Sequence, residues 1–127
     1  MVTQKLEIYK CNVCGNTVQV LLSGEGELVC CNQPMELMKP KCETSNELAE
    51  KHTPEIKDMD GKKYVVLEKH PMLPEHYIQF IEVISKDKSE IHLKYFLPNA
   101  KPQMEITCLG ENIDAYELCN IHGLWRK

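Results

Sequence analysis

The side chains that could bind a metal fall into two groups along this chain of 127 residues. The seven cysteines and five histidines are Cys11, Cys14, Cys30, Cys31, Cys42, Cys108 and Cys119, with His52, His70, His76, His92 and His122. An odd number of cysteines cannot form a closed set of disulfides, so metal binding is the first interpretation. Because five cysteines precede the first histidine, the order predicts two sites of different chemistry.

The first group consists of Cys11-x-x-Cys14 followed by a glycine, and the adjacent pair Cys30-Cys31. Four thiolates from two turns can close a tetrahedron, which suits zinc or a single iron. A zinc ribbon is the structural alternative, although a ribbon normally supplies a second C-x-x-C, and adjacent cysteines must splay to reach one ion. A thioredoxin-like redox pair is less favoured, because no βαβ pattern surrounds it.

The second group lies in four short motifs, and three of them stand beside proline or glycine. They are Glu50-Lys51-His52-Thr53-Pro54, His70-Pro71-Met72, His76-Tyr77-Ile78 and Cys119-Asn120-Ile121-His122-Gly123. Such neighbours place ligands in loops or at strand ends, where several strands converge. Four imidazoles and one thiolate are too many for tetrahedral zinc, so iron with one open position fits better. A thiolate opposite that position would donate electron density toward a small ligand.

Short strands must position both groups. Runs at 6–9, 17–21 and 27–29 predict a small antiparallel unit that ends near residue 38, and a unit of this size generally needs a metal to fold. Runs at 63–67, 77–84, 90–96, 104–108 and 115–118 predict a second, immunoglobulin-like antiparallel sandwich. The expected fold class is therefore mainly β. The expected domains are 1–38 and 49–127, joined by a polar linker at 39–48.

Composition excludes several classes of function. Hydrophobic residues make up 43% and charged residues 27% of the chain, an ordinary globular mixture without a long apolar run. Fifteen basic against nineteen acidic residues give a net charge of -4, so neither nucleic acid nor membrane is an expected partner. The start of the chain has no apolar signal region, and the expected location is the cytoplasm.

Residues 9–35 resemble desulforedoxin, a rubredoxin-like iron module. The segments that carry the resemblance are Y-K-C-N-V-C-G-N and G-E-L-V-C-C-N-Q-P-M, with the paired cysteines as their most specific feature. The resemblance implies an iron bound by Cys11, Cys14, Cys30 and Cys31 that carries one electron.

Nearly the whole chain resembles desulfoferrodoxin, the two-iron class of superoxide reductase. The motifs E-K-H-x-P, H-P-M, E-H-Y-I and C-N-I-H-G appear in that order after the desulforedoxin-like module. The resemblance implies His52, His70, His76 and His122 as equatorial iron ligands and Cys119 as the axial ligand. It also implies Lys51 as a cation beside the open position and Glu50 as a carboxylate that occupies this position in the ferric state.

The activity that this resemblance implies is the one-electron reduction of superoxide to hydrogen peroxide without release of oxygen. It also implies reduced rubredoxin as the electron donor and a homodimer. The alternative is a metal-stabilised electron-transfer or binding protein, in which the cysteine site holds zinc and the histidines are structural.

Several reactive or aromatic residues are expected to lie outside both sites. Alternation along 90–95 places His92 on the solvent side, and Cys42 in the linker is expected to be an exposed thiol. Cys108, at the end of an apolar run, is expected to be a small buried hydrophobe. Four further side chains are expected in the core rather than as a pocket lining: Met72, Tyr77, Phe80 and Trp125.

Overall fold

The structure, a computed structural model, describes residues 2–42, 47–110 and 112–127. The chain divides into two compact units, Met1–Lys39 and Pro40–Lys127, which are described separately. Part of the predicted linker, residues 43–46, lies outside the described residues. The domain boundaries 1–38 and 49–127 therefore stay a prediction.

The described part of the first unit contains five short strands, and a three-stranded antiparallel sheet forms its centre. The strands are β1 (Ile8–Lys10), β2 (Thr17–Gln19), β3 (Val29–Cys30), β4 (Gln33–Pro34) and β5 (Glu36–Met38). The sheet has the order β2-β1-β5, and β3 pairs with β4 in a separate hairpin. Only a few side chains are buried here, among them Ile8, Tyr9 and Cys11. Such a small core fits the expectation that a metal stabilises this unit.

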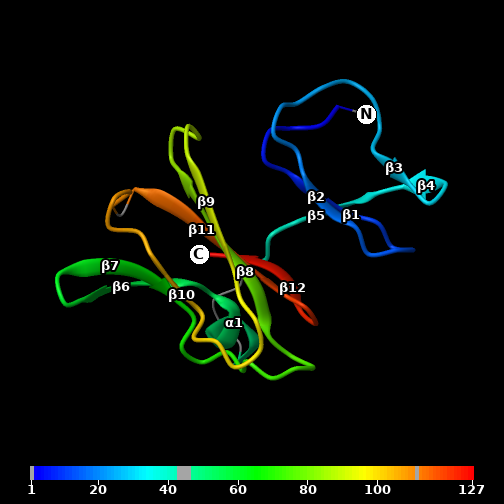
Figure 1. Cartoon of the computed structure of the whole chain (residues 1–127). Helices are drawn as coiled ribbons and strands as arrows, with labels where there is room; N and C mark the ends of the chain where they lie inside the picture. The colour runs from blue at the N-terminus through cyan, green and yellow to red at the C-terminus, as the bar shows by residue number, and fades with distance from the viewer. Residues whose placement is uncertain (1, 43–46, 111) are drawn as a thin grey trace. The chain divides into compact units, whose positions relative to one another are not determined.

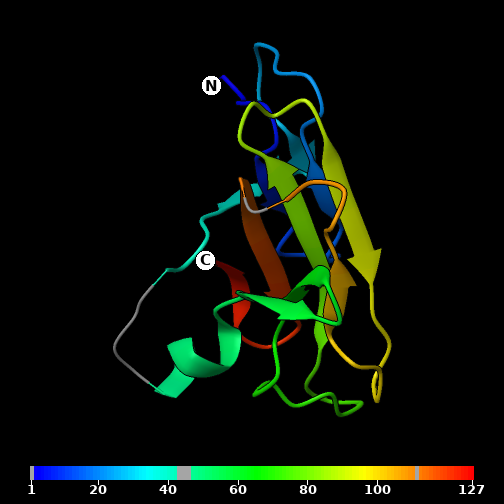
Figure 2. The same ribbon diagram turned by 90° about the vertical axis from the view of Figure 1, so that its left-hand side faces the viewer.

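Within its described residues, the second unit contains one short helix and two antiparallel sheets. Its elements are α1 (Glu47–His52), β6 (Glu55–Met59), β7 (Lys62–Val66), β8 (Ile78–Ser85), β9 (Ile91–Tyr95), β10 (Gln103–Glu105), β11 (Ile113–Cys119) and β12 (Gly123–Arg126). One sheet has the order β10-β7-β6 and the other the order β12-β11-β8-β9. The long strands β8, β9 and β11 run side by side in both ribbon views (Figures 1 and 2).

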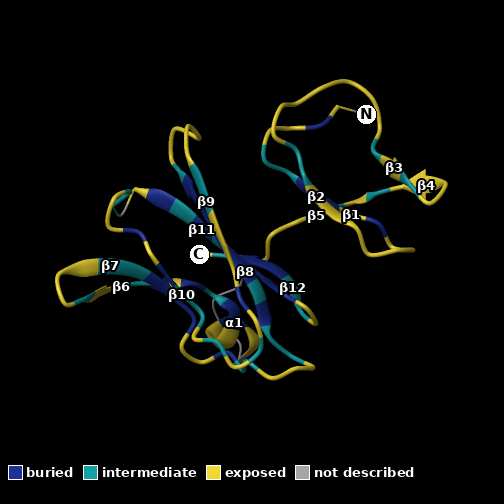
Figure 3. Ribbon diagram, viewed as in Figure 1, coloured by how far each residue is buried: buried dark blue, intermediate teal, exposed yellow. Residues whose placement is uncertain are grey.

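The core of this unit lies between its two sheets. Val65 and Met104 from the three-stranded sheet share one apolar cluster with Ile81 and Val83 of β8 and Ala115 of β11. Alternate residues of β8 and β11 supply this cluster, because successive side chains of a strand point to opposite faces. Figure 3 shows the buried stretches concentrated in β8, β11 and β12, whereas the hairpin ends are exposed. The core therefore supports the end of β11, where Cys119 lies.

The mainly β fold class is confirmed, but several elements were not expected. The helix α1 was not predicted, because six residues are too few for a helical period to be recognised. The short strands β4, β5, β6 and β12 were not predicted either. The expectation for Cys108 was wrong: β10 ends at Glu105, and Cys108 lies exposed in the following turn. Among the described residues, no helix is long or apolar enough to cross a membrane.

Candidate metal centres

The four cysteines of the first unit converge on one point. The sulfur atoms of Cys11, Cys14, Cys30 and Cys31 all lie within 4.8 Å of one another. Two of the separations are 3.6 Å for Cys14 to Cys30 and 3.9 Å for Cys30 to Cys31. Four sulfurs at about 2.3 Å from one ion in a tetrahedron are about 3.8 Å apart. The spacing therefore fits a single tetrahedral metal ion.

A tight turn explains how adjacent cysteines reach the same ion. Cys31 and Asn32 connect β3 to β4, and both have positive φ, at 52° and 62°. Positive φ at both central residues defines a type I′ turn, the connection that matches the twist of a two-residue hairpin. The reversed chain direction after Cys30 turns the sulfur of Cys31 back toward the other three.

Amide groups of the first turn point at the sulfurs. The backbone NH groups of Val13 and Cys14 donate to Cys11 Sγ at 3.4 and 3.5 Å, and that of Asn16 donates to Cys14 Sγ at 3.5 Å. Hydrogen bonds from Cys14 and Val13 lower the pKa of the Cys11 thiol to about 6. These donors stabilise thiolates, the form of cysteine that binds metals.

The histidines of the second unit come from separate elements and meet at one end of the sandwich. His52 ends α1, His70 and His76 bound the loop before β8, and His122 lies in the turn between β11 and β12. Asn120 ties two of these loops together. Its side-chain carbonyl accepts from the Tyr77 NH at 2.9 Å, and its side-chain amide donates to the Glu75 carbonyl at 3.1 Å.

The four imidazole rings form a closed square. Neighbouring rings meet edge to face, with centroids 4.6 Å apart for His52 and His70, 4.8 Å for His70 and His76, 5.0 Å for His76 and His122, and 4.8 Å for His122 and His52. His52 and His76 lie opposite each other, 6.3 Å apart. The Nε2 atoms of His52 and His70 are 3.1 Å apart. Two nitrogens at right angles and about 2.1 Å from one ion have a similar separation, about 3.0 Å.

Main-chain carbonyls fix which nitrogen of each buried ring faces the square. Nδ1 of His52 lies 2.7 Å from the Leu48 carbonyl, and Nδ1 of His70 lies 2.6 Å from the Pro71 carbonyl. A carbonyl only accepts, so Nδ1 of each ring carries the hydrogen and Nε2 presents its lone pair to the centre. Nε2 of His76 is buried and has no hydrogen-bond partner within the described part of the chain. A metal ion would satisfy it.

Burial favours the neutral form of three of these rings. It lowers the pKa of both His52 and His70 to about 4, and it also lowers the pKa of His76. A neutral imidazole is the form that binds a metal. His52, His70 and His76 therefore favour the form that can accept an ion.

Cys119 completes the second cluster. Its sulfur and one nitrogen each of His52, His76 and His122 lie within 4.8 Å of one another. His70 is not in that group of four, but its ring belongs to the square. Burial raises the pKa of the Cys119 thiol, although the His122 NH donates to the sulfur at 3.4 Å. Cys119 is 2% exposed, so a thiolate here would be held away from water.

Lys51 and Glu50 occupy the exposed surface of α1 beside the cluster. Three effects lower the pKa of His76. Burial is the largest, the charge of His122 is the second, and the charge of Lys51 is the third. Lys51 therefore lies near enough to act electrostatically on the square. Glu50 is not a member of either group of described side chains that converge on a point.

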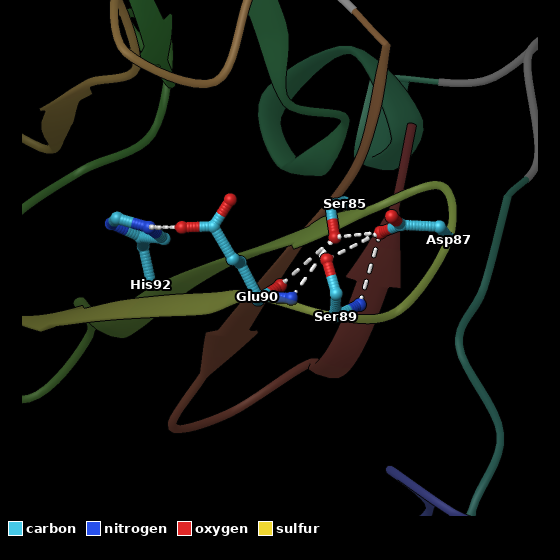
Figure 4. A network of polar contacts seen from close by, with 5 residues as sticks. All are labelled: Ser85, Asp87, Ser89, Glu90 and His92. Carbon is cyan, nitrogen blue, oxygen red and sulfur yellow. Dashed lines mark hydrogen bonds and ion pairs between the residues drawn. The ribbon is translucent and has the colours of Figure 1, made fainter.

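The residues expected outside the sites largely stay there. His92 faces Glu90 at 3.9 Å in the β8–β9 hairpin, where Ser85, Asp87 and Ser89 form the turn contacts (Figure 4). Cys42 is exposed, as expected. Trp125 is buried in the core but also stacks on His52, with centroids 4.9 Å apart and an interplanar angle of 24°.

Two positioning residues were missed by the sequence analysis. Asn120 lies within the C-N-I-H-G motif, between Cys119 and His122 in the sequence. Its position between two proposed ligands could have indicated a positioning role. Lys41 donates from Nζ to the His122 carbonyl at 3.0 Å, although 81 residues separate the two in sequence. Nothing in the local sequence around Lys41 indicates this contact.

Comparison with known families agrees with both clusters. The family model described as "Desulfoferrodoxin, N-terminal domain" matches residues 3–38, and the one described as "Desulfoferrodoxin" matches residues 44–127. A desulfoferrodoxin homolog of Archaeoglobus fulgidus is 45% identical, with 98% of each chain covered. The desulforedoxin of Megalodesulfovibrio gigas is 52% identical over 29 residues, 23% of this chain and 78% of that protein.

A solved structure shares the fold of the chain. The superoxide reductase from Treponema pallidum aligns with a TM-score of 0.67 at 21% identity, covering 97% of each chain. The prediction of one four-cysteine and one histidine-and-cysteine cofactor site is confirmed: the first cluster matches the desulforedoxin-like iron site and the second matches the superoxide reductase iron site.

Proposed function

Because the chain belongs to the desulfoferrodoxin family, we propose that it reduces superoxide to hydrogen peroxide at the histidine and cysteine cluster. The proposed ligands of the iron are His52, His70, His76, His122 and Cys119. The observation that carries the proposal is the closed square of four imidazoles with a buried thiol beside it. The ferrous ion would supply the single electron that superoxide takes up.

The residues of the chain would control access and protons. The reaction consumes one superoxide, one electron and two protons and forms one hydrogen peroxide. Superoxide is an anion, and the chain has a net charge of -4, so a local cation must attract it. With a Debye length of about 8 Å, distant acidic residues are largely screened, so Lys51, an exposed cation next to the ligand His52, would attract the anion. Its ammonium group, or water beside it, would donate protons to the departing peroxide.

The product ratio tests this proposal directly. Superoxide is generated by a pulse in the presence of the reduced, iron-loaded protein, and peroxide and oxygen are measured. Reduction yields one peroxide for each superoxide and no oxygen. Dismutation yields one peroxide for every two superoxides together with oxygen, and this outcome would contradict the proposal.

Removal of the Lys51 charge should slow the encounter with superoxide. Lys51→Ala is expected to lower the second-order rate constant about tenfold or more and to weaken its dependence on ionic strength, because steering by a local charge is lost. Lys51→Arg should retain most of the rate, since the charge is kept. The rate is measured by pulse-generated superoxide across a salt series. An unchanged rate and salt slope in Lys51→Ala would exclude this role.

Glu50 is proposed to bind the ferric iron reversibly. Glu50→Ala should leave the rate of the ferrous protein with superoxide within about twofold, because the carboxylate takes no part in that step. The absorption of the ferric form should shift, since water or hydroxide replaces the carboxylate. Glu50→Asp serves as the control, because it keeps a carboxylate at this position. An identical ferric spectrum in Glu50→Ala would count against coordination by Glu50.

The rival function is electron transfer or binding without superoxide reduction. In that case the cysteine cluster would hold zinc and the histidines would be structural. Metal analysis with a visible spectrum separates the two, because zinc is colourless while ferric thiolate absorbs strongly. Rubredoxin as the donor, a homodimer and a cytoplasmic location stay predictions that accompany the proposed reaction.

A further inference from the structure

Lys41 is held against β12 by its main chain. Its NH donates to the Leu124 carbonyl at 3.0 Å, and its carbonyl accepts from the Arg126 NH at 2.9 Å. The two contacts form a parallel bridge opposite Trp125. A residue that precedes α1 in the sequence is thereby fixed beside the turn that carries Cys119 and His122.

The side chain of Lys41 reaches the backbone of a proposed ligand. Its Nζ donates to the His122 carbonyl at 3.0 Å, and Trp125 Nε1 donates to the same oxygen at 3.1 Å. Both lone pairs of that carbonyl are therefore used. Nζ also lies 5.3 Å from the centroid of the Trp125 ring, a distance typical of a cation–π contact. Since Trp125 stacks on His52, the amine is linked to two sides of the square.

The charge of Lys41 acts on the cluster from the cysteine side. Burial raises the pKa of the Cys119 thiol, whereas the positive charge of Lys41 acts in the opposite direction. The amine also lies against Gly123: a Cβ built on this glycine would lie 4.0 Å from Nζ, an ordinary van der Waals distance. The turn that contains His122 and Gly123 therefore lies next to the ammonium group of Lys41.

We infer that Lys41 is a positioning residue of the histidine and cysteine centre, which fixes the His122 carbonyl and raises the reduction potential of the iron. The inference rests on the ligand set of the proposed function. A ferrous centre carries one positive charge less than a ferric centre, so a nearby cation favours the ferrous state. The hydrogen bond to the carbonyl restrains the turn, and the ammonium charge supplies the electrostatic effect.

Three substitutions separate the charge from the contact. Lys41→Arg keeps the charge, Lys41→Gln keeps a donor without the charge, and Lys41→Met removes both. The readout is a redox titration of the iron-loaded full chain, followed by the ferric absorption of this centre. At a fixed potential, the ratio of ferric to ferrous iron should rise about two- to fivefold in Lys41→Gln and Lys41→Met, and the rise should shrink at high salt. Lys41→Arg should keep the parent ratio.

Lys94 provides a matched control. Its Nζ lies 5.5 Å from the Phe96 centroid and donates to the Gln103 carbonyl at 3.4 Å, so it makes the same two kinds of contact. It lies on β9, which β8 separates from β11 and Cys119. Lys94→Gln should therefore leave the ratio unchanged.

The result that overturns the inference is a parent-like ratio in Lys41→Gln at low salt. Iron content and the spectrum of the cysteine centre verify that each variant is folded and loaded. Two outcomes are possible if Lys41→Gln and Lys41→Met lose the iron. If Lys41→Arg retains its iron, the inference is supported. If all three variants lose the iron, the inference is contradicted. The titration does not involve superoxide. A protein that shows the shift but fails to reduce superoxide would contradict only the proposed function.

Discussion

Cys119→Ser is expected to lower the rate of superoxide reduction by at least about 100-fold and to remove the thiolate absorption of the histidine centre. Loss even of groups that only support metal ligands typically costs about 10- to 100-fold in activity or affinity, and Cys119 is a proposed ligand itself. A serine hydroxyl does not ionise near pH 7, and at this 2% exposed position it would donate far less electron density. The measurement combines pulse-generated superoxide with the visible spectrum of the ferric form.

Cys31→Ser is the control for this prediction. It removes a thiolate from the four-cysteine cluster in the other unit, so it should abolish the rubredoxin-like spectrum. Superoxide reduction by the prereduced second centre should remain within about twofold of the parent rate. Full activity in Cys119→Ser at full iron occupancy would exclude Cys119 as a functional ligand. Loss of activity in Cys31→Ser would show that turnover requires the cysteine cluster.

The cysteine cluster could be predicted from sequence because its geometry is local. Cys11 and Cys14 lie on one turn, and Cys30 and Cys31 lie on another within the same small unit. The spacing alone fixed four sulfurs near one another, but it indicated neither the metal nor the type I′ turn. The turn depends on positive φ at Cys31 and Asn32, which residue types other than glycine adopt only rarely.

The histidine cluster depends on long-range contacts that periodicity does not reveal. His52 ends a six-residue helix that was not expected, and its ring stacks on Trp125, which is far away in the sequence. The motifs and the family resemblance brought the five ligands together, whereas among the elements next to the ligands the strand patterns predicted only β8 and β11. The contact of Lys41 shows most clearly what local sequence patterns cannot reveal, because its partner His122 lies 81 residues further along the chain.

Glu117 is a buried carboxyl that the sequence did not single out. It is 0% exposed in β11, and neither carboxylate oxygen has a hydrogen-bond partner among the described residues. Alternation places it on the same face of the strand as Ala115 and Cys119, toward the apolar core. Burial raises the pKa of Glu117 from 4.5 to about 9. The side chain is therefore protonated in the folded protein at pH 7.

Glu117→Gln should change how stability depends on pH. In the parent, the folded state binds the Glu117 proton more tightly than the unfolded state, so this stabilising contribution is complete below pH 4.5 and is lost as the pH rises toward 9. Glutamine does not titrate. The free energy of unfolding of Glu117→Gln relative to the parent should therefore increase by about 3 kcal/mol between pH 4.5 and 7, at 1.36 kcal/mol for each pH unit.

The difference between the two proteins isolates Glu117 from the histidines. Burial lowers the pKa of His52 and His70 to about 4, so their contribution to stability is present above pH 6.5 and is lost as the pH falls. This opposite trend occurs in parent and variant alike and cancels in the difference. Urea unfolding of the metal-free chain, followed by fluorescence of the single tryptophan, Trp125, reports on the second unit. Glu105→Gln, at an exposed site in β10, controls for the loss of one carboxylate. If the difference between Glu117→Gln and the parent stays constant from pH 4.5 to 7, Glu117 is ionised in the folded protein and must have found a partner that compensates for its burial.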